Sequence, residues 1–127
     1  MWRRAGRRLH LAGTFLAGSR LAGAQLAGAN LMDAVLHGCE LDGTQLLGAN
    51  LFGTKLGGAN LFNAVFAPEG NPGVPSGAPA ASLTGADWWR ASATSWRGTK
   101  GETLKRWLQA HFPKPDEPDP VPAWGDA

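Results

Sequence analysis

The residues of this 127-residue chain that could carry out chemistry are few and far apart in the sequence. The three histidines are His10, His37 and His111, and the single cysteine is Cys39. No two of these residues have the spacing of a metal-binding pair, and no carboxylate pair has ligand spacing either. No serine or threonine has a base placed for nucleophilic catalysis. The sequence therefore predicts no enzyme: no catalytic residue, no metal site and no cofactor.

The glycines also argue against a common ligand-binding motif. Nine of them recur in steps of five from Gly13 to Gly58, with Asp33 in the one gap, and Asn63 and Pro68 continue the series. No Gly-Lys-Ser/Thr sequence is present, so these glycines do not form a phosphate-binding loop. Turn-forming residues at a fixed spacing supply regular backbone bends. They indicate a repeating structure on which any binding site must be built.

Large apolar residues recur with the same period of five. On a helix each residue turns about 100°, so a step of five never forms a stripe along one face. On a strand an odd step alternates between the two faces. The remaining option is a solenoid that turns a corner once per repeat and points one large side chain inward each time. The predicted core ladder is Leu11, Leu16, Leu21, Leu26, Leu31, Leu36, Leu41, Leu46, Leu51, Leu56, Leu61 and Phe66.

The remaining positions of the repeat are restricted in a consistent way. A small residue stands two before the leucine in every unit after the first, and the residue directly before the leucine varies freely and should face water. The units AQLAG, ANLMD, AVLHG, TQLLG, ANLFG and ANLFN resemble those of the pentapeptide-repeat family. The resemblance implies an all-β fold, a right-handed quadrilateral β-helix with four units per coil. Residues 9–28, 29–48 and 49–68 would then form three stacked coils.

The second half of the chain is less regular. Residues 69–80 are rich in glycine and proline and are predicted to form a loop. Spacing of five resumes at Leu83, Trp88 and Ala93, so residues 81–98 are predicted to form a fourth coil, although a linker followed by a separate unit is an alternative. Residues 99–112 have helical apolar spacing, with Thr99 and Glu102 placed as a capping box. This helix would cap the solenoid, and the Pro-rich segment 113–127 would form a disordered tail.

Charge and composition restrict the partners. The net charge is +2, but residues 1–8 form a basic segment with four arginines, whereas residues 9–67 contain two cations, Arg20 and Lys55, and three carboxylates, Asp33, Glu40 and Asp42. Some pentapeptide-repeat proteins mimic DNA and engage DNA gyrase, and that function requires dense negative charge that these repeats lack. No apolar run is long enough to cross a bilayer, so no membrane partner is predicted. The single cysteine excludes an internal disulfide and favours a cytoplasmic location.

Two sets of residues are candidate interaction sites. Counting by twenty places Met32 beside Phe52 on the surface of neighbouring coils, and exposed apolar residues of this kind can bind a partner. A basic and aromatic cluster near the C-terminus could bind single-stranded nucleic acid by stacking and phosphate contacts. Alternatively, its tryptophans pack beneath the cap and its cations are solvated. The cluster is Trp88, Trp89, Arg90, Trp96, Arg97, Lys100, Lys105, Arg106 and Trp107.

The sequence thus predicts a structural scaffold or protein-interaction module whose partner is another protein. The alternative is a nucleic-acid-associated protein or a modulator of a topoisomerase such as DNA gyrase. No capping element precedes residue 9 in the sequence. The N-terminal end of the solenoid would therefore either end at a homodimer contact or fray.

Overall fold

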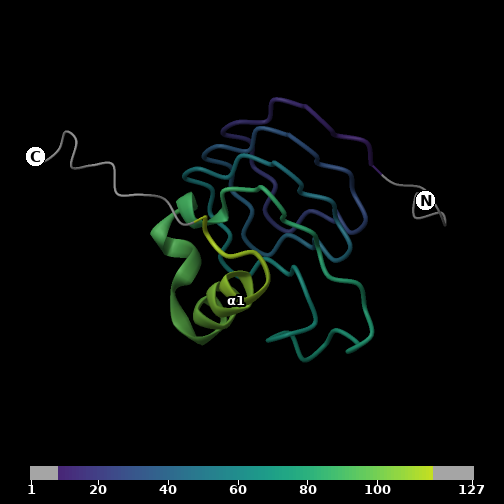
Figure 1. Ribbon diagram of the computed structural model, residues 1–127, viewed down its shortest axis with the longest axis vertical. Coiled ribbons are helices and arrows are strands. Elements are labelled where there is room, and N and C mark those ends of the chain that lie inside the picture. The colour runs from purple at the N-terminus through teal and green to yellow at the C-terminus, as the bar shows by residue number, and fades with distance from the viewer. Residues whose placement is uncertain (1–8, 116–127) are drawn as a thin grey trace, which may run out of the picture.

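The computed structural model describes residues 9–115, so the basic segment 1–8 and residues 116–127 of the predicted tail lie outside the described residues. From residue 9 the chain winds into a stack of four-sided coils (Figure 1). A loop leaves the stack after the third coil, and helices follow at the C-terminal end. No helix among residues 9–115 combines the length and the apolar character that a bilayer crossing requires.

Hydrogen bonds between residues twenty apart hold the coils together. Parallel bridges join His10 to Asn30 and Asn30 to Asn50, and the other three faces repeat this pattern. The bonds between the first three coils measure 2.7–3.0 Å from nitrogen to oxygen. Each face contributes one bridge residue per coil, so the faces are isolated bridges and not longer strands. The register of twenty matches the four units per coil that the family resemblance implies.

A residue with positive φ forms each corner. In the first corner the amide of Thr14 donates to the Leu11 carbonyl at 3.1 Å, and Gly13, the third residue of the turn, has φ +72°. A turn with positive φ at its third residue favours glycine, and Asp or Asn can substitute. Accordingly, Asp33 has φ 58° and Asn63 has φ 60°. Proline cannot adopt positive φ, and at Pro68, where the next such residue is due, the chain leaves the coil.

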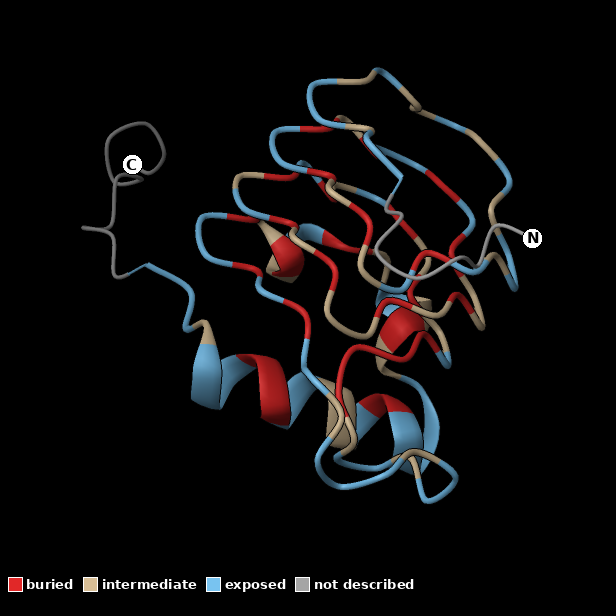
Figure 2. Ribbon diagram, turned by 90° about the vertical axis from the view of Figure 1, so that its right-hand side faces the viewer, coloured by how far each residue is buried: buried red, intermediate tan, exposed pale blue. Residues whose placement is uncertain are grey.

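The leucines fill the centre of the coils. From Leu26 to Phe66 every member of the predicted ladder is buried, whereas Leu11, Leu16 and Leu21 in the first coil are only half-buried (Figure 2). Polar side chains in the small position are satisfied internally. The hydroxyl groups of Thr44 and Thr54 donate to leucine carbonyls of the preceding coil at 2.9 and 2.8 Å. Burial of these hydroxyls therefore leaves no unpaired donor.

The fourth coil begins as predicted but changes path. The amide of Ala81 donates to the Phe66 carbonyl at 2.8 Å, Ser82 bridges Asn50, and Leu83 is buried. The chain then forms two 3-10 helices, η1 (Trp88–Arg90) and η2 (Ala93–Trp96). The sequence-based placement of Ala93 inside the solenoid is wrong, because Ala93 is exposed in η2.

Two side chains replace the ladder bonds that the fourth coil does not make. The Asp87 carboxylate accepts the Leu56 amide at 2.6 Å, and the Ser95 hydroxyl accepts the Leu61 amide at 2.8 Å. Without them these two amides would face the end of the stack unpaired. The last regular coil is therefore closed by side-chain acceptors where backbone carbonyls are missing.

The helix α1 (Gly98–His111) covers the C-terminal end, with Trp107 and Leu108 buried beneath it. It begins one residue before the predicted start, with Arg97 as its N-cap, and no side chain caps it. The predicted capping box of Thr99 and Glu102 is therefore wrong, since Thr99 already lies inside the helix. A Cβ on Gly101 would approach the Trp96 backbone to 2.4 Å, so this glycine allows α1 to pack on η2.

The corner geometry predicts opposite effects for two neighbouring glycines. Gly58 has φ +71°, whereas Gly57 lies outside the left-handed region, and added Cβ atoms at both would make only ordinary contacts. Gly58→Ala should lower the free energy of unfolding by about 1–2 kcal/mol because alanine is strained there. Gly57→Ala should leave it unchanged or raise it by up to about 1 kcal/mol. Chemical denaturation followed by circular dichroism measures both, and equal effects would contradict the assignment of Gly58 to the corner.

Candidate interaction site

Two of the potentially reactive side chains, His111 and Cys39, make structural contacts. Across residues 9–115, no three His, Cys, Asp or Glu side chains come together to hold a metal ion. The His111 ring is held through Nδ1 at 3.0 Å from the Trp107 carbonyl oxygen. The Cys39 thiol is buried and donates to the Leu16 carbonyl at 2.9 Å. Burial raises the pKa of Cys39, so the thiol stays protonated and serves as part of the core.

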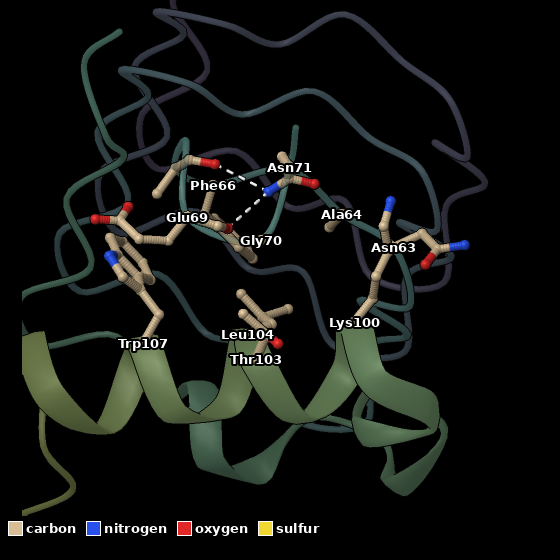
Figure 3. A pocket seen from close by; sticks show the side chains of 11 residues that line it. Asn63, Ala64, Phe66, Glu69, Gly70, Asn71, Lys100, Thr103, Leu104 and Trp107 are labelled. Carbon is tan, nitrogen blue, oxygen red and sulfur yellow. Dashed lines mark hydrogen bonds between the residues drawn. The ribbon is translucent and has the colours of Figure 1, made fainter. Parts of the chain in front are cut away.

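A small cavity lies between α1 and the segment 63–71 (Figure 3). Lys100, Thr103, Leu104 and Trp107 reach toward it from the helix. The amide of Asn71 donates to the carbonyls of Ala67 and Glu69 at 2.9 and 3.1 Å, which fixes the start of the loop. The cavity volume of about 20 Å³ is enough for a water molecule but not for a metabolite. This cavity is a packing feature of the cap.

Exposed apolar side chains gather instead at one corner of the solenoid. Met32 and Phe52 are the second residues of the turns at this corner, on successive coils, and are 37% and 46% exposed. Phe15 and Val35 directly follow the same corner on the first and second coils, and Phe15 is 74% exposed. We call Phe15, Met32, Val35 and Phe52 the apolar corner. Met32 and Phe52 are exposed in register on two successive coils, and Phe15 and the half-buried Val35 follow the same corner, so the four residues form a patch, which is more informative than scattered residues.

An open groove of about 280 Å³ lies at the C-terminal end of this corner. Thr84, which accepts the Gly53 amide at 2.9 Å, continues the series of Met32 and Phe52 onto the fourth coil and lines the groove. Trp89, Phe112 and Pro113 form further parts of its wall. We call this the Trp89 groove. Because Thr84 follows Phe52 in register on the fourth coil and also lines the groove, the apolar corner and the Trp89 groove adjoin along the solenoid axis.

The C-terminal tryptophans divide into buried and half-exposed members. Trp88 is 2% exposed, and its indole nitrogen donates to the Phe112 carbonyl at 2.6 Å. Trp89 and Trp96 each meet Trp88 edge to face with ring centroids 5.9 Å apart, and both are half-buried. Trp107 is buried under α1. The cations of the cluster are exposed, namely Arg90, Arg97, Lys100, Lys105 and Arg106.

The structure thus divides the candidate interaction residues from the sequence into two groups. Met32 and Phe52 lie on neighbouring coils, and Trp89 and Trp96 surround Trp88 at the cap. A comparison at a spacing of twenty pairs Phe15 with Val35 but does not relate either residue to Met32 and Phe52. Extending that comparison across the turn, to the residue three positions on, would have found Phe15 and Val35. The Trp89 groove has no such signal, because it depends on where α1 and residues 112–115 come to lie.

Comparison with known proteins shows what the repeat resembles. The model of pentapeptide repeats matches eight copies in residues 7–38 and 29–66. The fold is similar to the crystal structure of the pentapeptide-repeat protein Rfr23 from the cyanobacterium Cyanothece 51142, with a TM-score of 0.53 and 24% identity over 69% of this chain. These similarities confirm the predicted right-handed quadrilateral β-helix. The search of curated proteins gave no match.

Two further structures are pentapeptide-repeat proteins of Nostoc PCC 7120. The protein alr5209 is 25% identical over 66% of this chain, with a TM-score of 0.35. HetL, described as involved in the regulation of heterocyst differentiation, is 29% identical over 65% of this chain, with a TM-score of 0.27. The matched part of this chain spans 50% of Rfr23, 64% of alr5209 and 40% of HetL.

The burial of Cys39 predicts low thiol reactivity. In the native protein, Ellman's reagent at pH 8 should modify Cys39 at least about a hundredfold more slowly than in guanidinium chloride, because the thiol is both protonated and covered. The folded-state pKa is raised, so deprotonation favours the unfolded chain and stability should fall as the pH rises above the ordinary thiol range. Rapid modification of the native protein would contradict the inward position of Cys39.

Proposed function

Because this chain belongs to the pentapeptide-repeat family, we propose that it is a non-enzymatic scaffold that binds another protein along the apolar corner. The observation that carries the proposal is the exposure of Met32 and Phe52 in register on successive coils, with the exposed Phe15 at the same corner of the first coil. The interior supports the non-enzymatic part of the proposal. Leucines fill it, and it offers no pocket in which polar groups converge on a substrate.

The shape of the surface favours a protein partner. The apolar corner is convex and follows the solenoid axis, so it suits a partner that lies along several coils and not a small molecule that needs enclosure. The adjoining Trp89 groove provides a concave end with aromatic and proline walls. Aromatic residues at the centre of such contacts contribute most to affinity. A partner segment that crosses Met32 and Phe52 would reach the groove at Thr84.

A nucleic-acid-associated function is the second candidate, and the exposed cations beside Trp89 and Trp96 are the observation that favours it. Stacking on bases requires a free aromatic face. Trp88 and Trp107 are buried, and the two remaining tryptophans contact Trp88. Only part of the predicted cluster could therefore stack on a base, which ranks this candidate second.

The protein-binding proposal is tested with a matched pair of phenylalanines. Phe52 and Phe62 are both second residues of turns in the third coil, but their corners are diagonally opposite. We expect Phe52→Ser and Met32→Ser to weaken partner capture by about tenfold or more, as expected for residues at the centre of an interface. Phe62→Ser should leave capture unchanged. The measurement is quantitative mass spectrometry of proteins retained from nuclease-treated native lysate.

Retention of the same proteins by the Phe52 and Phe62 variants would remove the apolar corner as the binding site. Thermal melting of each variant verifies the fold. The nucleic-acid candidate has its own readout, the anisotropy of labelled single-stranded DNA at low salt. Binding that falls steeply with salt and is reduced by Arg97→Ala would support that candidate instead.

A further inference from the structure

The two ends of the solenoid differ in how their backbone groups are paired. In the inner coils, the residue before each leucine directs both its amide and its carbonyl toward the preceding coil. For example, the Asn30 amide donates to the Leu9 carbonyl, and the Asn30 carbonyl accepts from the Leu11 amide, both at 2.8 Å. In the first coil the corresponding residues are His10, Phe15, Arg20 and Gln25. Their amides and carbonyls have no hydrogen-bond partner within residues 9–115. The first coil therefore presents a β-edge on all four faces.

The side chains show the same difference between the ends. Leu31, Leu36 and Leu41 in the second coil are at most 1% exposed, whereas Leu11, Leu16 and Leu21 in the first coil are half-buried. At the other end, Trp88, Trp107 and Leu108 are buried under η1 and α1. Within residues 9–115, the C-terminal end of the solenoid is covered and the N-terminal end is open.

The shape of the open edge limits what can pair with it. The chain turns a corner every five residues, so a straight strand could follow this edge along only one face. Pairing on all four faces requires another coil with the same corners. Stacking of the first coil on the last coil of another molecule is blocked, because α1 covers that end. Only two first coils can meet, and that arrangement closes after two molecules.

We propose that two copies of this chain form a dimer by joining their first coils head to head around a two-fold axis. The fit follows from the handedness that both copies share. Each right-handed coil rises steadily along the solenoid axis. A two-fold axis that is perpendicular to the solenoid axis and passes through the corner where the coil begins makes the first coil of one copy continue the first coil of the other. The gap between the two edges is then constant at one coil spacing, about 4.8 Å. With an axis through any other corner, the gap between the two edges would change by one coil spacing partway around the coil.

This axis fixes which residues meet. The first face pairs with the fourth face of the second copy, and the second face pairs with the third. His10 thus faces Gln25 of the second copy, and Phe15 faces Arg20 of the second copy. Paired edges run antiparallel, and each pair of residues exchanges two backbone hydrogen bonds. These bonds use the amide and the carbonyl of each residue that are unpaired in the first coil.

The side chains of the second pair are complementary. Phe15 is 74% exposed and Arg20 is exposed, and both precede a leucine and so point outward. In adjacent edge positions an arginine can lie over a phenylalanine ring, a favourable cation–π contact. The symmetry creates this contact twice. No arginine faces arginine at the paired positions, as it would if the third faces met each other.

Sedimentation velocity of the full chain from about 1 to 500 micromolar tests the dimer. The end of one coil is smaller than a standard interface, so we expect a dissociation constant on the order of micromolar. A monomer at every concentration would overturn the proposal.

Charge variants of one residue test the pairing itself. Phe15→Lys places a cation opposite Arg20 of the second copy and should weaken the dimer by about tenfold or more. Phe15→Glu places an anion there and should leave the affinity unchanged or raise it. Val35→Lys, the same position one coil further on, is the control and should have no effect. Equal weakening by both Phe15 variants would indicate that Phe15 faces itself and would exclude this axis. Thermal melting confirms that each variant folds.

Discussion

A positive φ at the third residue of each turn is the constraint on which the whole structure depends. It turns the chain by a quarter of a coil, so that the next leucine again points inward and residues twenty apart fall in register. The interior and the inter-coil hydrogen bonds both follow from that register. Glycine meets the requirement at most corners, Asp33 and Asn63 meet it at two, and Pro68 cannot. The repeat ends at the residue whose chemistry forbids the bend.

Ending a solenoid requires chemistry that the repeat does not contain. Each inner coil satisfies its neighbours with backbone groups, but the last coil must find other acceptors. Here the Asp87 carboxylate and the Ser95 hydroxyl supply them, and α1 covers the apolar centre. These contacts are specific to single side chains and do not recur. The C-terminal third of the described chain is therefore irregular in sequence because each residue there has a separate role.

This difference explains how much the sequence could predict. Twelve units in phase identify the corners, the inward leucines and the coil register, because every repeat gives the same information. The sequence also placed Met32 beside Phe52. It failed where a contact occurs only once. The 3-10 path that exposes Ala93, the uncapped start of α1 and the Trp89 groove all depend on packing between distant segments. Local patterns such as Thr99 and Glu102 then mislead, because tertiary packing decides where the helix begins.

The two ends of the solenoid are expected to differ in stability. Stability in a repeat structure is close to a sum over units and their nearest neighbours, so a coil with a neighbour on one side only is held less firmly. The first coil has such a single neighbour among the described residues, and its leucines are half-buried. Phe15 adds to the imbalance, because an aromatic ring left 74% exposed gains almost nothing from the fold of its own chain. A second first coil would supply the missing neighbour, so association and ordering of this end are expected to be the same event.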